Sequence, residues 1–169
     1  MASAEIFDPN ANGGIGSFQS TGSMSTGRYE HTATLMGDGR VLVAGGYNGS
    51  SEKCLLRFLI RMQWWNRRVY NHREFGHRSG SHTATRLPNG RVLLIGGQSM
   101  SSQSAIVQIL DPTGNGGIGA FTAMTSLNAA RAAHTTTLLN DARLLVTGGH
   151  NSTGFLRAQN FMMHQQTQV

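Results

Sequence analysis

The sequence is poor in cysteine, proline and charge, and each shortage excludes a class of protein. A single cysteine, Cys54, rules out an internal disulfide and any zinc site built from several cysteines. Only 13% of the 169 residues are charged, which is too few for a helical bundle or a coiled coil. No apolar run approaches the roughly 20 residues of a membrane-spanning helix, and no signal peptide is visible at the N-terminus. What remains is a chain of one-domain length with 22 glycines and 3 prolines.

Positive charge is concentrated in one stretch of the chain. The net charge is +6, and residues 53–77 contribute +5 of it through six basic side chains and Glu74. The same stretch holds both tryptophans and Cys54, so its composition differs from that of the rest of the chain. A basic, aromatic segment suits nucleic acid, because it can stack on bases and neutralise phosphates. We disfavour nucleic acid as a partner, since a shifted reading frame, argued below, explains the same composition.

Two blocks of sequence recur along the chain. The first begins three residues before a histidine, with arginine in two of its copies (Arg-x-x-His), and continues through a β-branched stretch, a polar turn, an arginine and an apolar stretch to a diglycine. It occupies residues 28–46, 79–97 and 131–149, and its histidines are spaced by 51 and 52 residues. The second block, residues 4–18, returns 103 positions later at 107–121. The recurring positions are His31, His82 and His134; Arg40, Arg91 and Arg143; Gly45, Gly46, Gly96, Gly97, Gly148 and Gly149; Asp8 and Asp111; and Phe18 and Phe121.

Each recurrence predicts four short β-strands. The β-branched and apolar stretches flank a polar turn, and the apolar strand ends at the diglycine. The proline after Asp8 or Asp111 ends a third strand because proline cannot donate to a ladder, and Phe18 or Phe121 belongs to a fourth. This pattern resembles the kelch repeat, whose unit is one propeller blade, although phenylalanine stands where kelch usually carries tryptophan. The sequence around the diglycines looks most like galactose-oxidase-like bacterial kelch proteins.

The resemblance implies an all-β fold. We expect a partial kelch-type β-propeller of about three four-stranded antiparallel blades over residues 1–156. The 169 residues supply just over three repeats, whereas propellers close with typically 4–8 blades. The propeller is therefore predicted to be open in this chain, and its open blade edges predict self-association.

Residues 53–77 and 157–169 break the repeat. With permitted codons, residues 53–62 read one base back give Val-Leu-Ala-Glu-Ile-Phe-Asp-Pro-Asn, and residues 63–77 read one base forward begin Asn-Gly-Gly-Ile-Gly-Ala-Phe. Residues 157–164 read one base back give Ser-Ala-Glu-Phe-Tyr-Asp-Ala-Pro. We hypothesise that 53–77 is an out-of-frame translation that disrupts the second blade, and that 157–169 is an out-of-frame tail. Local propensity in the first of these segments also allows a helix at 55–66.

The recurring residues are interpreted as blade scaffold. Three histidines can form a zinc set, but residues at one place in successive blades repeat a local environment instead of converging on a shared site. The diglycines lack the Gly-Lys-Ser/Thr of a phosphate loop and instead predict positive φ or close backbone approach. Oxygen-rich surroundings at Asp8 and Asp111 suit calcium, but the carboxylates lack EF-hand spacing. No catalytic, cofactor-binding or metal-ligating residue is predicted.

The resemblance leaves three functions open. It implies a copper site of two histidines, two tyrosines and a Tyr–Cys crosslink, to which Tyr29, Tyr47, Tyr70 and Cys54 cannot be matched. We therefore favour a non-catalytic scaffold whose loops bind a protein or a glycan. The alternatives are a fragment of a copper-radical oxidase whose active site is absent here, and the product of a decayed or frame-shifted gene with no function. Relatives of this kind are often exported, so the resemblance also favours an exported protein.

Overall fold

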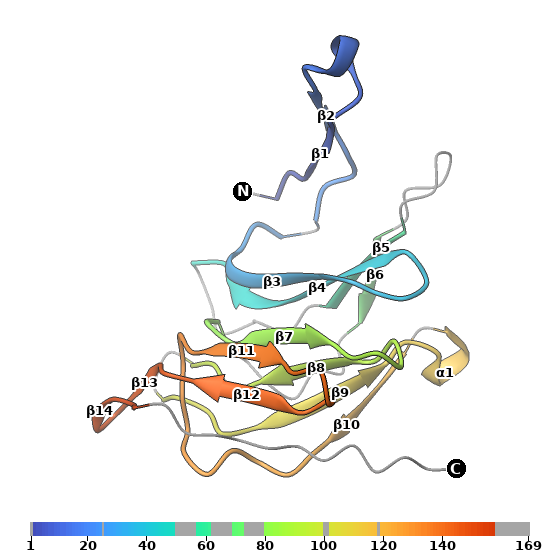
Figure 1. Ribbon diagram of the computed structural model, residues 1–169. Helices are drawn as coiled ribbons and strands as arrows, with labels where there is room; N and C mark the ends of the chain where they lie inside the picture. Colours follow the sequence, from blue (N-terminus) through green and yellow to red (C-terminus); the bar gives the residue numbers. More distant parts are fainter. Residues whose placement is uncertain are drawn as a thin grey trace.

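The computed structural model consists almost entirely of short antiparallel strands (Figure 1). It describes residues 2–24, 26–49, 80–99, 102–117 and 119–157, together with the backbone of 57–61 and 69–72. No helix in these described stretches is long and apolar enough to cross a membrane.

Two four-stranded sheets form the middle of the molecule, and in both every strand pairs antiparallel with the next one along the chain. This is the meander that the repeat predicts for one blade. The first sheet contains β3 (Tyr29–Leu35), β4 (Arg40–Tyr47), β5 (Arg57–Arg61) and β6 (Val69–His72). The second contains β7 (Thr83–Arg86), β8 (Val92–Ile95), β9 (Val107–Asp111) and β10 (Ala120–Ala123).

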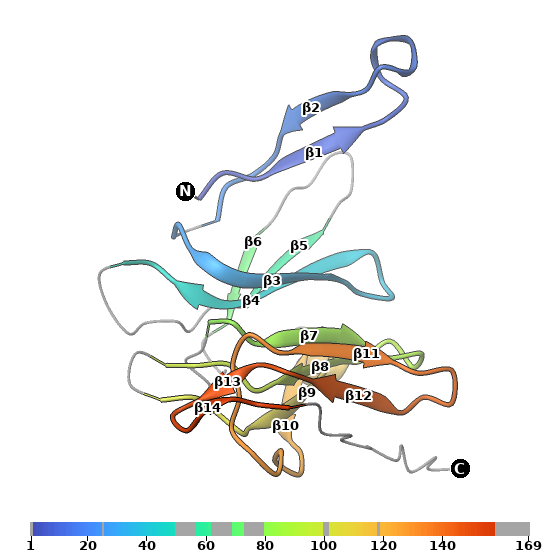
Figure 2. The same ribbon diagram turned by 60° about the vertical axis from the view of Figure 1, so that its left-hand side comes forward.

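Two-stranded sheets lie on either side of this pair. Strands β1 (Glu5–Asp8) and β2 (Ser17–Ser20) precede it, and β11 (Thr135–Leu138) and β12 (Leu144–Thr147) follow it. A small hairpin of β13 (His150–Asn151) and β14 (Gly154–Phe155) comes last. The turns η1 (Asn12–Gly14) and α1 (Gly114–Gly117) connect β1 to β2 and β9 to β10. In both ribbon views the β1–β2 hairpin lies at one end of the molecule, and β11 to β14 lie toward the other (Figures 1 and 2).

Strand β8 is buried on both faces and joins two hydrophobic clusters. Successive side chains of a strand point to opposite faces of the sheet. Val92 and Leu94 therefore pack with Leu42 and Ala44 of β4 in a cluster between the first and second sheets. The alternate side chains, which include Leu93, pack on the other face with β12. The second blade thus packs apolar side chains against both the first and the third.

The architecture confirms the predicted all-β class and an open, partial β-propeller. None of the sheets in the described part of the chain closes on itself. The helix allowed by local propensity at 55–66 is wrong over Arg57–Arg61, which form β5 in the position that β9 occupies in the next sheet. A strand prevails there because β4 offers an edge for pairing. The rest of the two segments hypothesised to be out of frame lies outside the described residues, apart from β6 and residue 157.

Candidate functional site

The recurring histidines lie at the junctions between repeats. Nε2 of His82 lies 2.9 Å from Oγ1 of Thr32 in the preceding repeat. Nε2 of His134 lies 3.1 Å from Oγ1 of Thr83, one repeat further on. Both histidines are buried, whereas His31 in the first repeat is exposed. The three side chains therefore occupy separate junctions and do not meet in one site.

Burial makes the last of these histidines hard to protonate. Desolvation, followed by the charge of Arg131, lowers the pKa of His134 from 6.5 to about 4. His31 is exposed, but partial desolvation and then the charge of Arg28 still lower its pKa. At neutral pH the ring of His134 is uncharged, so one ring nitrogen is a donor and the other an acceptor. A threonine hydroxyl can serve either role.

Two arginines that the sequence reasoning did not assign also belong to the scaffold. Arg28 and Arg131 are buried, and each donates from Nη1 to a glycine carbonyl of its own repeat. The distances are 2.6 Å to Gly45 and 2.9 Å to Gly148. The signal for them is the recurring Arg-x-x-His motif, which is absent from the second repeat because Ser79 replaces the arginine.

Arg40 connects its own turn to the following repeat. Its Nε donates to the carboxylate of Asp38 at 2.6 Å, within the turn between β3 and β4. Its other two nitrogens donate to the carbonyls of Gly117 at 2.7 Å and Pro112 at 2.9 Å, which flank the β9–β10 connection. One guanidinium therefore fastens two consecutive sheets at their turn ends.

The corresponding arginines make part of this pattern. Arg143 donates to Asp141 at 2.5 Å, as Arg40 does to its aspartate. Arg91 pairs with Asp111 at 3.4 Å. Asp111 also accepts hydrogen bonds from the hydroxyl and the backbone N–H of Thr113, and chiefly these bonds lower the pKa of its carboxyl.

The remaining recurring residues lie in the two outer hairpins. Asp8 accepts a hydrogen bond from the backbone N–H of Asn10 at 2.9 Å, so its carboxylate caps a turn. Phe18 is 69% exposed, and its ring centroid lies 5.0 Å from that of Phe7. Phe121 is half-buried against the cluster between the first two sheets.

The diglycines occupy backbone positions that other residues disfavour. A Cβ on Gly96 would lie 2.7 Å from the carbonyl oxygen of Arg131, and one on Gly149 would lie 2.6 Å from that of Ala132. Both the left-handed backbone and this close approach require glycine. Positive φ angles between 58° and 102° are found at Gly45, Gly46, Gly96, Gly97, Gly148 and Gly149.

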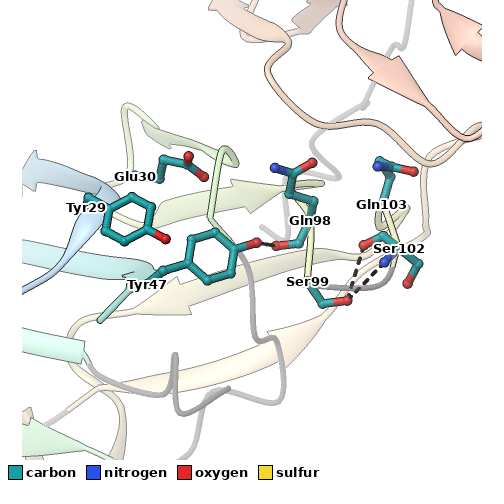
Figure 3. Close-up of a pocket in the computed structure, with 7 residues that line it drawn as sticks. All are labelled: Tyr29, Glu30, Tyr47, Gln98, Ser99, Ser102 and Gln103. Atoms are coloured by element: carbon teal, nitrogen blue, oxygen red, sulfur yellow. Dashed lines mark hydrogen bonds between the residues drawn. The ribbon is translucent and has the colours of Figure 1, made fainter. Parts of the chain in front are cut away.

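A cavity of about 350 Å³ lies between the first and second repeats, at the diglycine end of their strands (Figure 3). No motif in the sequence predicts this cavity. Its lining side chains are two tyrosines, one glutamate, two glutamines and two serines. The lining residues are Tyr29, Glu30, Tyr47, Gln98, Ser99, Ser102 and Gln103.

Hydrogen bonds hold part of this lining in place. The rings of Tyr29 and Tyr47 lie with their centroids 5.6 Å apart and tilted by 36°. The Tyr47 hydroxyl donates to the backbone carbonyl of Gln98, which ties the first repeat to the second across the cavity (Figure 3). Oε2 of Glu30 accepts a hydrogen bond from Ser81 at 2.8 Å.

The described residues do not fit the copper site that the resemblance implies. No group of three histidine, cysteine, aspartate or glutamate side chains lies close enough among them to hold a metal ion. The cavity has two tyrosines but neither a histidine nor a cysteine among its lining residues. Tyr70 and Cys54 belong to residues whose side chains the structure does not describe.

The described sheets form an open β-propeller, and His82, His134, Arg40 and Gly96 contact residues of a neighbouring repeat. No protein-family model and no curated protein matches the sequence. The structure is similar to that of a fungal alcohol oxidase of the AA5 family in complex with copper, with a TM-score of 0.70 and 19% sequence identity. The match covers 89% of this chain and 33% of the oxidase, so the chain spans a third of that protein. At this identity the likeness shows a galactose-oxidase-like fold and nothing of the activity.

Proposed function

We propose that this chain is a piece of a kelch-type β-propeller that binds a glycan in the cavity between its first two repeats. The observation that carries the proposal is the composition of the cavity wall. Aromatic rings bury the apolar C–H face of a sugar, and amides, hydroxyls and a carboxylate exchange hydrogen bonds with its hydroxyls. A concave site with a few convergent polar groups is the usual form of a small-ligand site.

The glycan is preferred to a protein ligand because of the size and chemistry of the cavity. About 350 Å³ suits one or two sugar rings and lies at the low end of the range for small-molecule sites. Protein interfaces depend on larger surfaces of about 800 Å² per partner. Positions Tyr29 and Glu30 lead β3, and Gln98 follows β8, so rigid strands hold the site from both repeats.

A second candidate is a fragment of a copper alcohol oxidase, which the structural likeness to the AA5 oxidase favours. In that case the reactive centre belongs to sequence outside the described residues, because those residues do not supply its ligand set. The cavity tyrosines would then have a supporting role in the fold.

Binding to immobilised mono- and oligosaccharides separates the two candidates. We expect the chain to retain at least one neutral sugar, and Tyr29→Ala and Glu30→Gln each to weaken retention about tenfold, the size that the loss of one stacking or charge-assisted contact gives. Phe155→Ala is the matched control, because Phe155 is 95% exposed and distant in sequence from the cavity lining. Loss of binding in the control variant, or no retention of any sugar by a folded chain, would overturn the glycan proposal.

A further inference from the structure

The backbone pairing at the two cavity tyrosines recurs in all three repeats, but the side chains at this place differ. In each repeat, the residue two positions before the recurring histidine pairs with the residue that follows the diglycine. The pairs are Tyr29 with Tyr47, Gly80 with Gln98, and Ala132 with His150. The first pair is aromatic, whereas the other two contain no tyrosine. The fold makes the same demand at each of these places, so the difference between the pairs indicates a role apart from the fold.

The residue beside each pair also combines a fixed backbone with a variable side chain. Glu30, Ser81 and Ala133 directly precede the recurring histidines, and all three have left-handed φ angles of 53° or 54°. Hydrogen bonds join their backbones from repeat to repeat. The N–H of Ser81 donates to the carbonyl of Glu30 at 3.4 Å, and that of Ala133 donates to the carbonyl of Ser81 at 3.0 Å. The carboxylate of Glu30 therefore leaves the chain from a position that the neighbouring repeat helps to hold.

Gly80 provides the space in which this carboxylate meets an aromatic ring. Its φ angle is not positive, so the backbone alone does not require glycine here. A Cβ at this position would overlap the ring of Tyr47 and lie 2.7 Å from Oε2 of Glu30. Because one added atom would touch both groups, the carboxylate lies beside the Tyr47 ring. The other repeats carry larger residues, Tyr29 and Ala132, at the place of this glycine.

The charge at this end of the cavity is negative. Glu30 is the one charged residue among those that line the cavity. Its Oε2 accepts a hydrogen bond from Ser81, and an ionised carboxylate has room for further donors on its two oxygens. The face of a tyrosine ring also attracts cations through its quadrupole. A carboxylate beside two rings with centroids 5.6 Å apart therefore favours a small cation with hydrogen-bond donors, and an ammonium group meets this description.

We propose that the cavity selects a sugar with a free amino group, and that the ammonium binds at Glu30 and the two tyrosine rings. This inference rests on the proposed glycan function and names the class of glycan. Figure 3 shows the glutamine and serine residues of the lining grouped apart from Tyr29 and Glu30. They are available to the hydroxyls of the same sugar, so the amino group and the rest of the sugar contact different parts of the lining.

Charge sets the expected order of affinities. An amino sugar brings a cation to the carboxylate of Glu30, and its N–H groups donate to the carboxylate oxygens. N-acetylation removes the charge and leaves a single N–H. A sugar acid brings a second carboxylate close to the first, and like charges at short range repel each other. We therefore expect amino sugars to bind most tightly, neutral and N-acetylated sugars less tightly, and sugar acids least tightly.

Isothermal titration with matched sugars measures this order. Glucosamine, N-acetylglucosamine and glucuronic acid each differ from glucose at one carbon, and the galactose series covers a site that requires the other epimer. At about pH 6 both an amine and a carboxylate are charged. We expect the amino sugar to bind about tenfold more tightly than the neutral sugar of its series, the size of one charge-assisted contact. At about 0.5 M salt most of this preference should vanish, because Glu30 is exposed and salt screens exposed charges.

Two matched variants locate the preference. Glu30→Gln keeps the shape of the side chain and removes its charge, so the ratio of the affinities for amino and neutral sugars should fall to about one. Glu5→Gln removes the same charge from an exposed position of β1 that does not line the cavity, and the tenfold ratio should persist. Circular dichroism of both variants establishes that the strands remain folded.

Failure of this inference can be distinguished from failure of the glycan proposal. Equal affinity for amino and neutral sugars, or an unchanged ratio in Glu30→Gln, would overturn the amino-sugar inference and leave glycan binding intact. A folded chain with no affinity for any sugar would overturn both. Nα-acetyl-lysine amide offers the ammonium without a sugar ring. If it binds as tightly as the amino sugar, both proposals are wrong, because the cavity then recognises the amine of a peptide.

Discussion

Three of the side chains that repeat in this sequence, His82, His134 and Arg40, link neighbouring repeats. His82 and His134 each approach a threonine one repeat earlier, and Arg40 reaches two carbonyls one repeat later. A link of this kind can satisfy polar groups at a buried junction, where an unsatisfied group costs about 1–3 kcal/mol. Recurrence at a fixed spacing is therefore what a junction role produces, since every junction makes the same demand.

The neutral state of His134 gives its junction a pH dependence. Its pKa is lowered from 6.5 to about 4 by burial and then by Arg131, so the folded chain disfavours the protonated ring. The pKa of His134 is lower in the folded chain than the value near 6.5 expected in the unfolded chain. The fold therefore has its full stability above about pH 6.5, and stability is lost as the pH falls toward about 4. The loss has an upper limit of about 3 kcal/mol.

Urea unfolding at several pH values between about 7.5 and 4.5 measures this effect. As the pH is lowered, the free energy of unfolding should fall more steeply in the unmodified chain than in His134→Asn, which has no titrating ring. The difference between the two free energies of unfolding should therefore change steadily between about pH 6.5 and 4.5. Equal slopes for the two proteins would contradict the assignment, because the ring would then be titrating as it does in the unfolded chain.

At the scale of elements, β8 determines how the repeats are coupled. Its alternate side chains belong to different clusters: Leu94 contacts the first sheet, and Leu93 contacts β12. Both are almost fully buried. Truncating either side chain should lower the free energy of unfolding by about 2–5 kcal/mol. The two truncations weaken packing on opposite faces of the strand.

Hydrogen exchange distinguishes the two truncations. Leu93→Ala should lower the protection of amides in β11 and β12 more than in β3 and β4, and Leu94→Ala should do the reverse. Ile15→Ala is the control, because Ile15 is 85% exposed in the β1–β2 turn, and it should change neither. If both core variants lower protection uniformly, the described part of the chain unfolds as one unit and the nearest-neighbour coupling expected of repeat proteins is absent.

Elements with a local signal could be predicted from the sequence, and features made by two repeats could not. A diglycine and Asp-Pro ends bounded β8, β1 and β9 correctly, because turn chemistry and strand breaking are local. The predicted end at the diglycine is wrong for β4, which continues through Gly45 and Gly46 to Tyr47. The cavity escaped prediction because Tyr29 and Gln98 meet only when two repeats pack. Local propensity also failed at Arg57–Arg61, where the open edge of β4 imposed a strand.

At the scale of the whole molecule, the open question is whether residues 53–77 are what the gene encodes. The two other outer hairpins agree in pairing and in turn geometry, at β1–β2 and β9–β10. Residues 53–77 should supply the third copy, and out-of-frame reading of their codons restores both of its motifs. The restored Gly-Gly-Ile-Gly falls at 64–67, which is 51 positions after residues 13–16. Agreement in motif and in position together is hard to obtain by chance from codon degeneracy.

Resequencing the DNA across codons 48–80 and 150–169 tests this hypothesis. We expect compensating single-base changes that restore Ala-Glu-Ile-Phe-Asp-Pro and Asn-Gly-Gly-Ile-Gly, and with them the third copy of the hairpin. Tryptic peptides of the natural protein give an independent readout. With the sequence as it stands, trypsin should cleave after Arg57, Arg61 and Arg67. The restored motifs contain no basic residue, so these cleavages should then be absent. Peptides ending at these arginines would contradict the hypothesis that residues 53–77 are an out-of-frame translation. The segment would then be a genuine +5 arm inserted in the first four-stranded sheet, and the propeller would owe its β5 and β6 to a sequence that no other repeat uses.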